Sequence, residues 1–178
     1  MVPGLSNSGP QHWQTLWQPQ LPECFRIEQR DFDHAVCAEW VSNIETAVRT
    51  HGEDSVLVGH SCGSIAIPHW AAQTQLKIAG AVMVAPSDVE AEGFPAEAVG
   101  FAPVPLTRLP FRTLVIASNK DPYLKLERAI RFAAAWGSLL VNIGDAGHIN
   151  TNAGYGPWPE GLRLLRDFLD TLKTTTST

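Results

Sequence analysis

The 178-residue sequence is poor in cysteine, in clustered positive charge and in long apolar runs. Its three cysteines, Cys24, Cys37 and Cys62, form no CxxC pair and no spacing typical of a zinc site, so we expect neither a disulfide framework nor a metal centre. The 13 basic residues are scattered and the formal net charge is −5. This charge argues against a nucleic-acid surface or an anionic membrane as a partner, because both need clustered Lys and Arg.

Targeting signals are also missing from the sequence. No basic stretch followed by an apolar one opens the chain, and no run of about 18 apolar residues occurs, so we expect neither a signal peptide nor a membrane span. The low cysteine content fits a reducing compartment, and we expect a cytoplasmic protein. A content of 44% hydrophobic and 17% charged residues is typical of a globular chain. The length suggests one domain, at residues 1–173, followed by a disordered tail at 174–178.

Short apolar runs alternate with helical periodicity along the chain, which is typical of a mostly parallel sheet with helices on both faces. A sixth strand is cut short at Met1 and Val2, because a Pro-Gly turn follows at once, and we expect the natural start to lie upstream. The pattern therefore predicts an α/β fold of about six strands, with the expected order 2-1-3-4-5-6. The other five predicted strands lie near residues 24–28, 55–59, 78–85, 112–118 and 139–143.

Two further segments, 36–48 and 162–172, carry apolar residues at spacings of three and four, which predicts amphipathic helices. Pro157 and Pro159 stand where the second helix should begin, a position that tolerates a missing N–H. The connection at 87–110 is different, because it holds four prolines and has no clear periodicity. It is too long for an incidental loop, so we expect it to cover or border a binding cleft.

The motif Gly59-His60-Ser61-Cys62-Gly63 stands between a predicted strand and a helical stretch at 65–73. At such a turn, glycines on either side of a serine let strand and helix approach closely and expose the hydroxyl above the sheet. This context favours Ser61 as a nucleophile over a plain turn in which the serine caps the helix. Cys62 is expected to pack rather than react, because nothing nearby marks a stabilised thiolate.

A serine nucleophile needs a base that takes its proton and returns it to the leaving group, and imidazole suits both tasks near neutrality. His148 is the strongest of the six histidines, because it lies in a loop directly after the last predicted strand. The alternative is an ordinary surface-loop histidine. The base in turn needs an acid that holds it in one tautomer. We favour Asp121, which completes the order Ser, Asp, His; the open alternatives are that Asp121 caps a helix before Pro122, or that Asp88 is the acid.

Two backbone segments are candidates for binding an oxyanion. The Cys62 amide begins the helix after the serine turn at residues 59–63, the elbow, where the partial positive charge favours an anion. In the expected strand order, the loop after the first strand flanks the same crevice, so the amide of Leu5 or Gly4 would supply a second donor. Aromatic side chains are more often core than pocket. The candidates for pocket lining are His12, Trp13, His60 and Phe101.

These segments together resemble the small α/β-hydrolase family that includes retinoblastoma-binding protein 9, and the resemblance extends over nearly the whole chain. It implies a compact α/β-hydrolase fold without a large cap domain, and a triad on Ser61, Asp121 and His148. The family's members are mostly described as serine hydrolases with esterase or peptidase-like activity. The retinoblastoma-binding motif LxCxE is missing here, so that partner is not carried over. The segments that carry the resemblance are Val2-Pro3-Gly4, His12-Trp13, Gly59-His60-Ser61-Cys62-Gly63, Asp121-Pro122 and Gly147-His148-Ile149-Asn150.

We therefore expect a serine hydrolase that cleaves small carboxylic esters or related acyl bonds through an acyl-serine, without a cofactor or metal. A small substrate is expected, because only the 87–110 segment provides cover. The alternative is a non-catalytic interaction module that keeps the fold and binds a partner through this proline-rich segment. The sequence identifies no protein partner and no physiological substrate.

Overall fold

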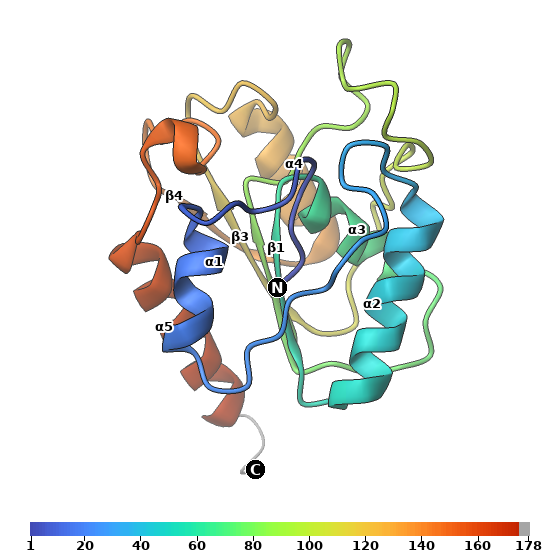
Figure 1. Ribbon diagram of the computed structural model, residues 1–178, viewed down its shortest axis with the longest axis vertical. Coiled ribbons are helices and arrows are strands. Elements are labelled where there is room, and N and C mark those ends of the chain that lie inside the picture. Colours follow the sequence, from blue (N-terminus) through green and yellow to red (C-terminus); the bar gives the residue numbers. More distant parts are fainter. Residues whose placement is uncertain (175–178) are drawn as a thin grey trace.

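A parallel sheet of four strands forms the centre of the molecule (Figure 1). The computed structural model describes residues 1–174. The strands lie side by side in chain order, and each neighbouring pair is parallel. Their carboxyl ends therefore meet at one edge of the sheet, where loops from different strands can come together. The strands are β1 (Val56–His60), β2 (Gly80–Val84), β3 (Arg112–Ala117) and β4 (Leu139–Asn142).

Side chains along the strands alternate between two apolar layers, because successive residues of a strand point to opposite faces. In β2, Val82 and Val84 belong to one layer, whereas Ala81 and Met83 belong to the other. Both faces are therefore apolar and need to be covered by helices. Figure 1 shows α1 and α5 on one side of the sheet and α2 and α3 on the other.

Helices α1 and α5 contribute to the first layer through Trp13, Trp17 and Phe168, and α2, α3 and α4 form the second layer with residues such as Trp40 and Phe132. The helices are α1 (Trp13–Trp17), α2 (Cys37–His51), α3 (Cys62–Ala71), α4 (Leu126–Trp136) and α5 (Pro159–Thr174), with 3₁₀ turns η1 (Gln18–Gln20) and η2 (Thr151–Ala153).

The two amphipathic helices predicted from periodicity are confirmed as α2 and α5. Helix α5 begins at Pro159, as the prolines indicated, and includes Thr174, which the sequence had assigned to a disordered tail. The rest of that predicted tail, residues 175–178, lies outside the part of the chain that the structure describes.

The prediction of six strands is wrong, because only four form within residues 1–174. Met1 and Val2 are too short a segment for a strand, and Val2 makes a single parallel bridge to Gly59. The segment predicted as a strand at 24–28 pairs only with Met1, whose carbonyl accepts from the Ile27 amide at 2.9 Å and whose amino group donates to the Phe25 carbonyl. The two segments lie in the expected order beside β1, but they lack the length for a regular ladder.

The connection between β2 and β3, residues 85–111, contains no helix or strand. It lies against the start of α2, where Val99 pairs with Val36 and donates to the Ala35 carbonyl at 2.8 Å. Its first part is tied to α4, because Arg128 contacts both Asp88 and Glu90. This segment takes the place of the helix that usually joins two parallel strands, and it adds no helical cap above the sheet.

Candidate active site

Ser61 occupies a strained turn between β1 and α3. Its φ of 55° and ψ of −126° lie outside the regions that ordinary residues adopt. The turn is held from β2, because the Ser61 amide donates to the Val84 carbonyl at 3.0 Å. The Ser64 hydroxyl donates to the same carbonyl at 3.1 Å. These contacts keep a partly exposed hydroxyl at the carboxyl edge of the sheet.

The two glycines of the motif are required by close packing. A Cβ added to Gly63 would lie 2.3 Å from the carbonyl oxygens of both Val2 and Pro3. A Cβ on Gly59 would lie 2.8 Å from the Cα of Ser64 in α3. Any side chain at these positions would push the amino-terminal segment or the helix away, so the steric reason for the GxSxG pattern is present in this chain.

His148 lies in the loop after β4 and points at the serine. Its Nε2 is 2.8 Å from Ser61 Oγ, and the residue is only 6% exposed. Two buried side chains hold this loop from behind: His60 Nε2 donates to the His148 carbonyl at 3.0 Å, and Trp13 Nε1 donates to the Ile149 carbonyl at 2.8 Å. The imidazole therefore sits on a loop that the core keeps in place.

Asp121 completes the chain of contacts, because each of its carboxylate oxygens lies 2.9 Å from His148 Nδ1. Its side chain is fully buried, and Oδ1 also accepts from the Tyr123 amide at 2.9 Å. Asp121 does not cap a helix, since α4 begins only at Leu126 with Lys125 as its N-cap. The loops that carry Asp121 and His148 are joined by Ser118, whose Oγ accepts from the Ala146 amide at 2.9 Å.

Asp88, the alternative acid, is used elsewhere. Its Oδ1 lies 3.3 Å from Nε of Arg128, in the ion-pair cluster that also includes Glu90. The structure thus brings together Ser61, His148 and Asp121, which lie far apart in the sequence, and leaves Asp88 on the α4 side.

The expected oxyanion donors lie around Ser61. Gly4 packs against the serine, since a Cβ added there would be 2.7 Å from Ser61 Cβ and 3.2 Å from Ser61 Oγ. Within residues 1–174, the amides of Gly4, Leu5 and Cys62 donate no hydrogen bond to the protein. Burial raises the pKa of the Cys62 thiol well above its usual value, which agrees with a packing role for this side chain.

The aromatic candidates form packing contacts rather than open walls. Phe101 is 1% exposed and packs edge-on against Trp40 at 5.5 Å between ring centroids, so the ring lies in the core between α2 and α3. Trp13 is fully buried. His12, His60 and His148 stand in a row: the ring centroids of His12 and His60 are 4.7 Å apart, and those of His60 and His148 are 4.9 Å apart.

Burial keeps these two supporting histidines neutral. It lowers the pKa of His12 to about 4, with smaller contributions from Arg26 and His148. It also lowers the pKa of His60 well below the usual value, and the neighbouring His148 and His12 act in the same direction. A neutral His60 keeps one ring N–H for the His148 carbonyl.

Two residues at the site were missed in the sequence. The Ser87 hydroxyl lies 2.9 Å from Ser61 Oγ and is 4% exposed, and the Tyr123 ring stands edge-on to His148 at 4.7 Å between centroids. A usable signal existed for Ser87, because it stands two residues after the predicted strand at 78–85, which follows the serine motif in the chain.

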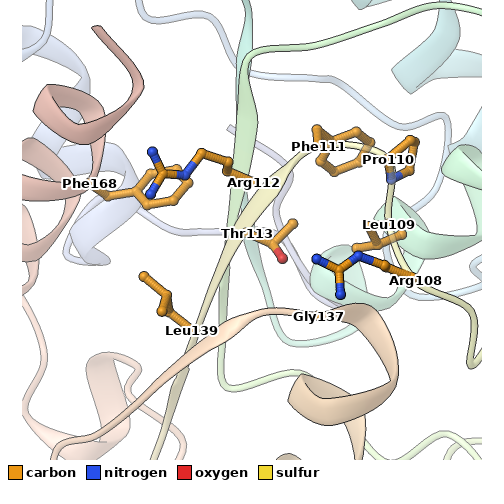
Figure 2. A pocket seen from close by; sticks show the side chains of 9 residues that line it. All are labelled: Arg108, Leu109, Pro110, Phe111, Arg112, Thr113, Gly137, Leu139 and Phe168. Carbon is orange, nitrogen blue, oxygen red and sulfur yellow. The ribbon is translucent and has the colours of Figure 1, made fainter. Parts of the chain in front are cut away.

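A surface hollow of about 570 Å³ lies away from these residues. Figure 2 shows its lining side chains around the amino ends of β3 and β4, including Arg108, Arg112 and Phe168. The triad residues lie at the carboxyl ends of the strands, so this hollow is not part of the candidate site.

Residues 1–174 contain neither a cluster of metal-ligating side chains nor a helix suited to a membrane. No group of three or more His, Cys, Asp and Glu side chains in this part of the chain is arranged to hold a metal ion. No helix in it combines the length and the apolar character that crossing a membrane requires.

Comparisons with known proteins agree with this architecture. The family model described as serine hydrolase matches residues 1–167. A YdeN-like hydrolase of Pectobacterium atrosepticum is 37% identical, with a TM-score of 0.85 over 96% of this chain and 89% of that chain. The ydeN gene product of B. subtilis is 18% identical, with a TM-score of 0.76 over 94% of this chain and 95% of that one.

A more distant neighbour is the esterase RhEst1 of a Rhodococcus species, which is 14% identical with a TM-score of 0.57 over 76% of this chain and 73% of that one; this likeness concerns the fold alone. The search of curated proteins found no match. The resemblance to the narrower family of retinoblastoma-binding protein 9 stays a prediction. Because the family model spans nearly the whole chain and the 37% identical relative covers 96% of it, the chain belongs to the serine hydrolase family and has the α/β-hydrolase fold.

Proposed function

We propose that this hydrolase cleaves small carboxylic esters or related acyl bonds, with Ser61 as nucleophile, His148 as general base and Asp121 as the group that orients the imidazole. One observation carries the proposal: hydrogen-bonding contacts run without a gap from Ser61 Oγ to His148 Nε2 at 2.8 Å and from His148 Nδ1 to the Asp121 carboxylate at 2.9 Å. These contacts, in this order, are those of a Ser-His-Asp triad that transfers an acyl group to the serine.

In the acylation step, His148 Nε2 takes the Ser61 proton while Oγ forms a bond to the substrate's carbonyl carbon. The carbonyl electron pair moves onto the oxygen, which accepts hydrogen bonds from the amides of Cys62 and of Leu5 or Gly4. The bond to the alcohol then breaks, and His148 returns the proton to the leaving oxygen. Water hydrolyses the resulting acyl-serine by the same route.

A small ester is favoured by what surrounds the serine. The 85–111 connection adds no helical cap, and its far part packs against α2 instead of covering Ser61. The exposed ring of Tyr123, 56% accessible, stands beside His148 and would border the alcohol or acyl group. The esterase of Rhodococcus shares this fold.

Covalent labelling with a fluorophosphonate probe tests the proposal, because such a probe reacts with an activated serine. We expect labelling of the wild type, no labelling of Ser61→Ala, and wild-type labelling of Ser42→Ala, which removes an exposed serine of α2. Hydrolysis of p-nitrophenyl esters of graded acyl length would then show whether short acyl groups are preferred. A folded wild type that is neither labelled nor active on any ester would contradict the proposal and favour the non-catalytic interaction module.

A further inference from the structure

A second serine touches the nucleophile. Ser87 follows β2 after Ala85 and Pro86, and its Oγ lies 2.9 Å from Ser61 Oγ. The residue is 4% exposed, so its hydroxyl is shielded from water. A buried hydroxyl in contact with the reacting oxygen has a direct influence on how charge builds up on that oxygen.

The direction of this hydrogen bond follows from the neighbouring groups. His148 Nδ1 faces both oxygens of Asp121, so the neutral imidazole carries its proton there and Nε2 accepts. The only proton of the Ser61 hydroxyl is then donated to Nε2. Ser61 Oγ has no proton left for Ser87, so the Ser87 hydroxyl is the donor and Ser61 Oγ the acceptor.

The backbone around Ser87 holds this donor in place. The Ser87 carbonyl accepts from the Val89 amide at 3.1 Å, and the next residue, Asp88, donates its amide to the Tyr123 carbonyl at 2.9 Å. The donor is therefore preorganised and does not need to reorient during a reaction.

We propose that Ser87 assists the departure of Ser61 from the acyl-enzyme, as a hydrogen-bond donor to the leaving oxygen; this inference rests on the ester hydrolysis proposed above. In that step, water bonds to the acyl carbon and gives its proton to His148 Nε2. The bond between the acyl carbon and Ser61 Oγ then breaks, its electron pair goes to Oγ, and Oγ takes the proton from His148. The Ser87 hydroxyl keeps its own proton and donates a hydrogen bond while charge develops on Oγ.

The effect differs between the two half-reactions, because only interactions that are stronger in the transition state than in the ground state accelerate a step. In the free enzyme, Ser61 Oγ is a hydroxyl oxygen that already accepts from Ser87. In the acyl-enzyme, Oγ is an ester oxygen, a weaker acceptor, and the hydrogen bond strengthens only as the bond to carbon breaks. Ser87 therefore accelerates deacylation and contributes little to acylation.

The test measures the two steps separately in Ser87→Ala, with a p-nitrophenyl ester in stopped flow and with intact-protein mass spectrometry of the acyl-enzyme. We expect the deacylation rate constant to fall roughly tenfold or more, as for the loss of one hydrogen bond to a charged oxygen, and acyl-enzyme to accumulate. The acylation rate and kcat/KM should change by less than about threefold. Where deacylation limits turnover, kcat and KM then fall together.

Two further variants separate this role from a structural one. Ser87→Thr keeps a hydroxyl and should restore deacylation at least partly. Thr113→Val removes another buried hydroxyl, which contacts Ser138 at the amino end of β3, away from the triad. This variant should leave the rates of acylation and deacylation unchanged. Equal losses in acylation and deacylation of Ser87→Ala, or an unchanged deacylation rate, would overturn the inference. Failure of the proposed function looks different, because the wild type would then form no acyl-Ser61 at all.

Discussion

Replacing Asp121 by asparagine tests how the carboxylate orients His148. In the wild type, Oδ1 accepts from the Tyr123 amide at 2.9 Å, and both oxygens face His148 Nδ1. In Asp121→Asn, the side-chain oxygen takes the Oδ1 position, because the Tyr123 amide needs an acceptor there. The new NH₂ group then faces Nδ1 and donates to it. His148 then carries its proton on Nε2, so Nε2 is unable to accept the proton of Ser61.

The expected loss follows from this wrong tautomer. The same change in enzymes with a Ser-His-Asp triad lowers kcat by about 10⁴-fold, which corresponds to about 5.5 kcal/mol of transition-state stabilisation. We expect a loss of this order here. Stability should fall much less, by about 1–3 kcal/mol, because the fully buried group loses one charge-assisted hydrogen bond but keeps the Tyr123 contact.

Initial rates of p-nitrophenyl acetate hydrolysis measure the loss, and urea unfolding of the same samples establishes that the variant is folded. The matched control is Asp88→Asn, since Asp88 also follows a strand but contacts Arg128 instead of His148. The control should keep its rate within about threefold of wild type. The reasoning is refuted if Asp121→Asn keeps more than about a tenth of the wild-type kcat, or if Asp88→Asn loses as much as Asp121→Asn.

Two other predictions concern the surroundings of the triad. Gly4→Ala would place a Cβ 2.7 Å from Ser61 Cβ and should lower kcat/KM by about a hundredfold, because it displaces the nucleophile. In the control Gly9→Ala, the added Cβ has no neighbour within 4 Å, and kcat/KM should be unchanged. Equal values of kcat/KM for the two variants would contradict this prediction. His12 has a pKa of about 4 in the fold and about 6.5 when unfolded, so the unfolded chain binds its proton first as pH falls. His12 alone should therefore reduce the free energy of unfolding by about 2 kcal/mol between pH 7 and pH 5. Urea unfolding of the wild type and of His12→Asn at both pH values checks this. The variant keeps an acceptor for the Gln14 amide and should lose less free energy of unfolding than the wild type. An equal loss in the two proteins would count against the prediction.

Much of the fold was readable from local patterns. Apolar runs of strand length predicted the four strands that form, and apolar spacings of three and four predicted α2 and α5. The two segments that failed as strands, at Met1-Val2 and 24–28, lie beyond β1 at the edge of the sheet. Met1, Val2 and Ile27 are buried, whereas Phe25 is 50% exposed, and too few backbone groups pair to form a ladder.

The candidate site divides in the same way. The elbow was predictable, because the need for glycines at 59 and 63 arises from atoms within a few residues of Ser61 and from one close segment. His148 and Asp121 were predicted as site residues because each follows a predicted strand, but Asp88 also follows one. Only the tertiary structure separated the two aspartates, since β3 and β4 bring their loops together while Asp88 turns toward α4.

The sequence by itself thus determined the four strands of the sheet, the amphipathic helices α2 and α5 and the strained serine turn, because these depend on side-chain periodicity and on steric limits acting over a few residues. Tertiary structure alone decided which acid faces His148, that Phe101 is core, that His60 and Trp13 support the histidine loop, and that Ser87 touches Ser61. These relations join residues far apart along the chain. Their distances are set by the register of the parallel strands and by packing between layers, which no local pattern encodes.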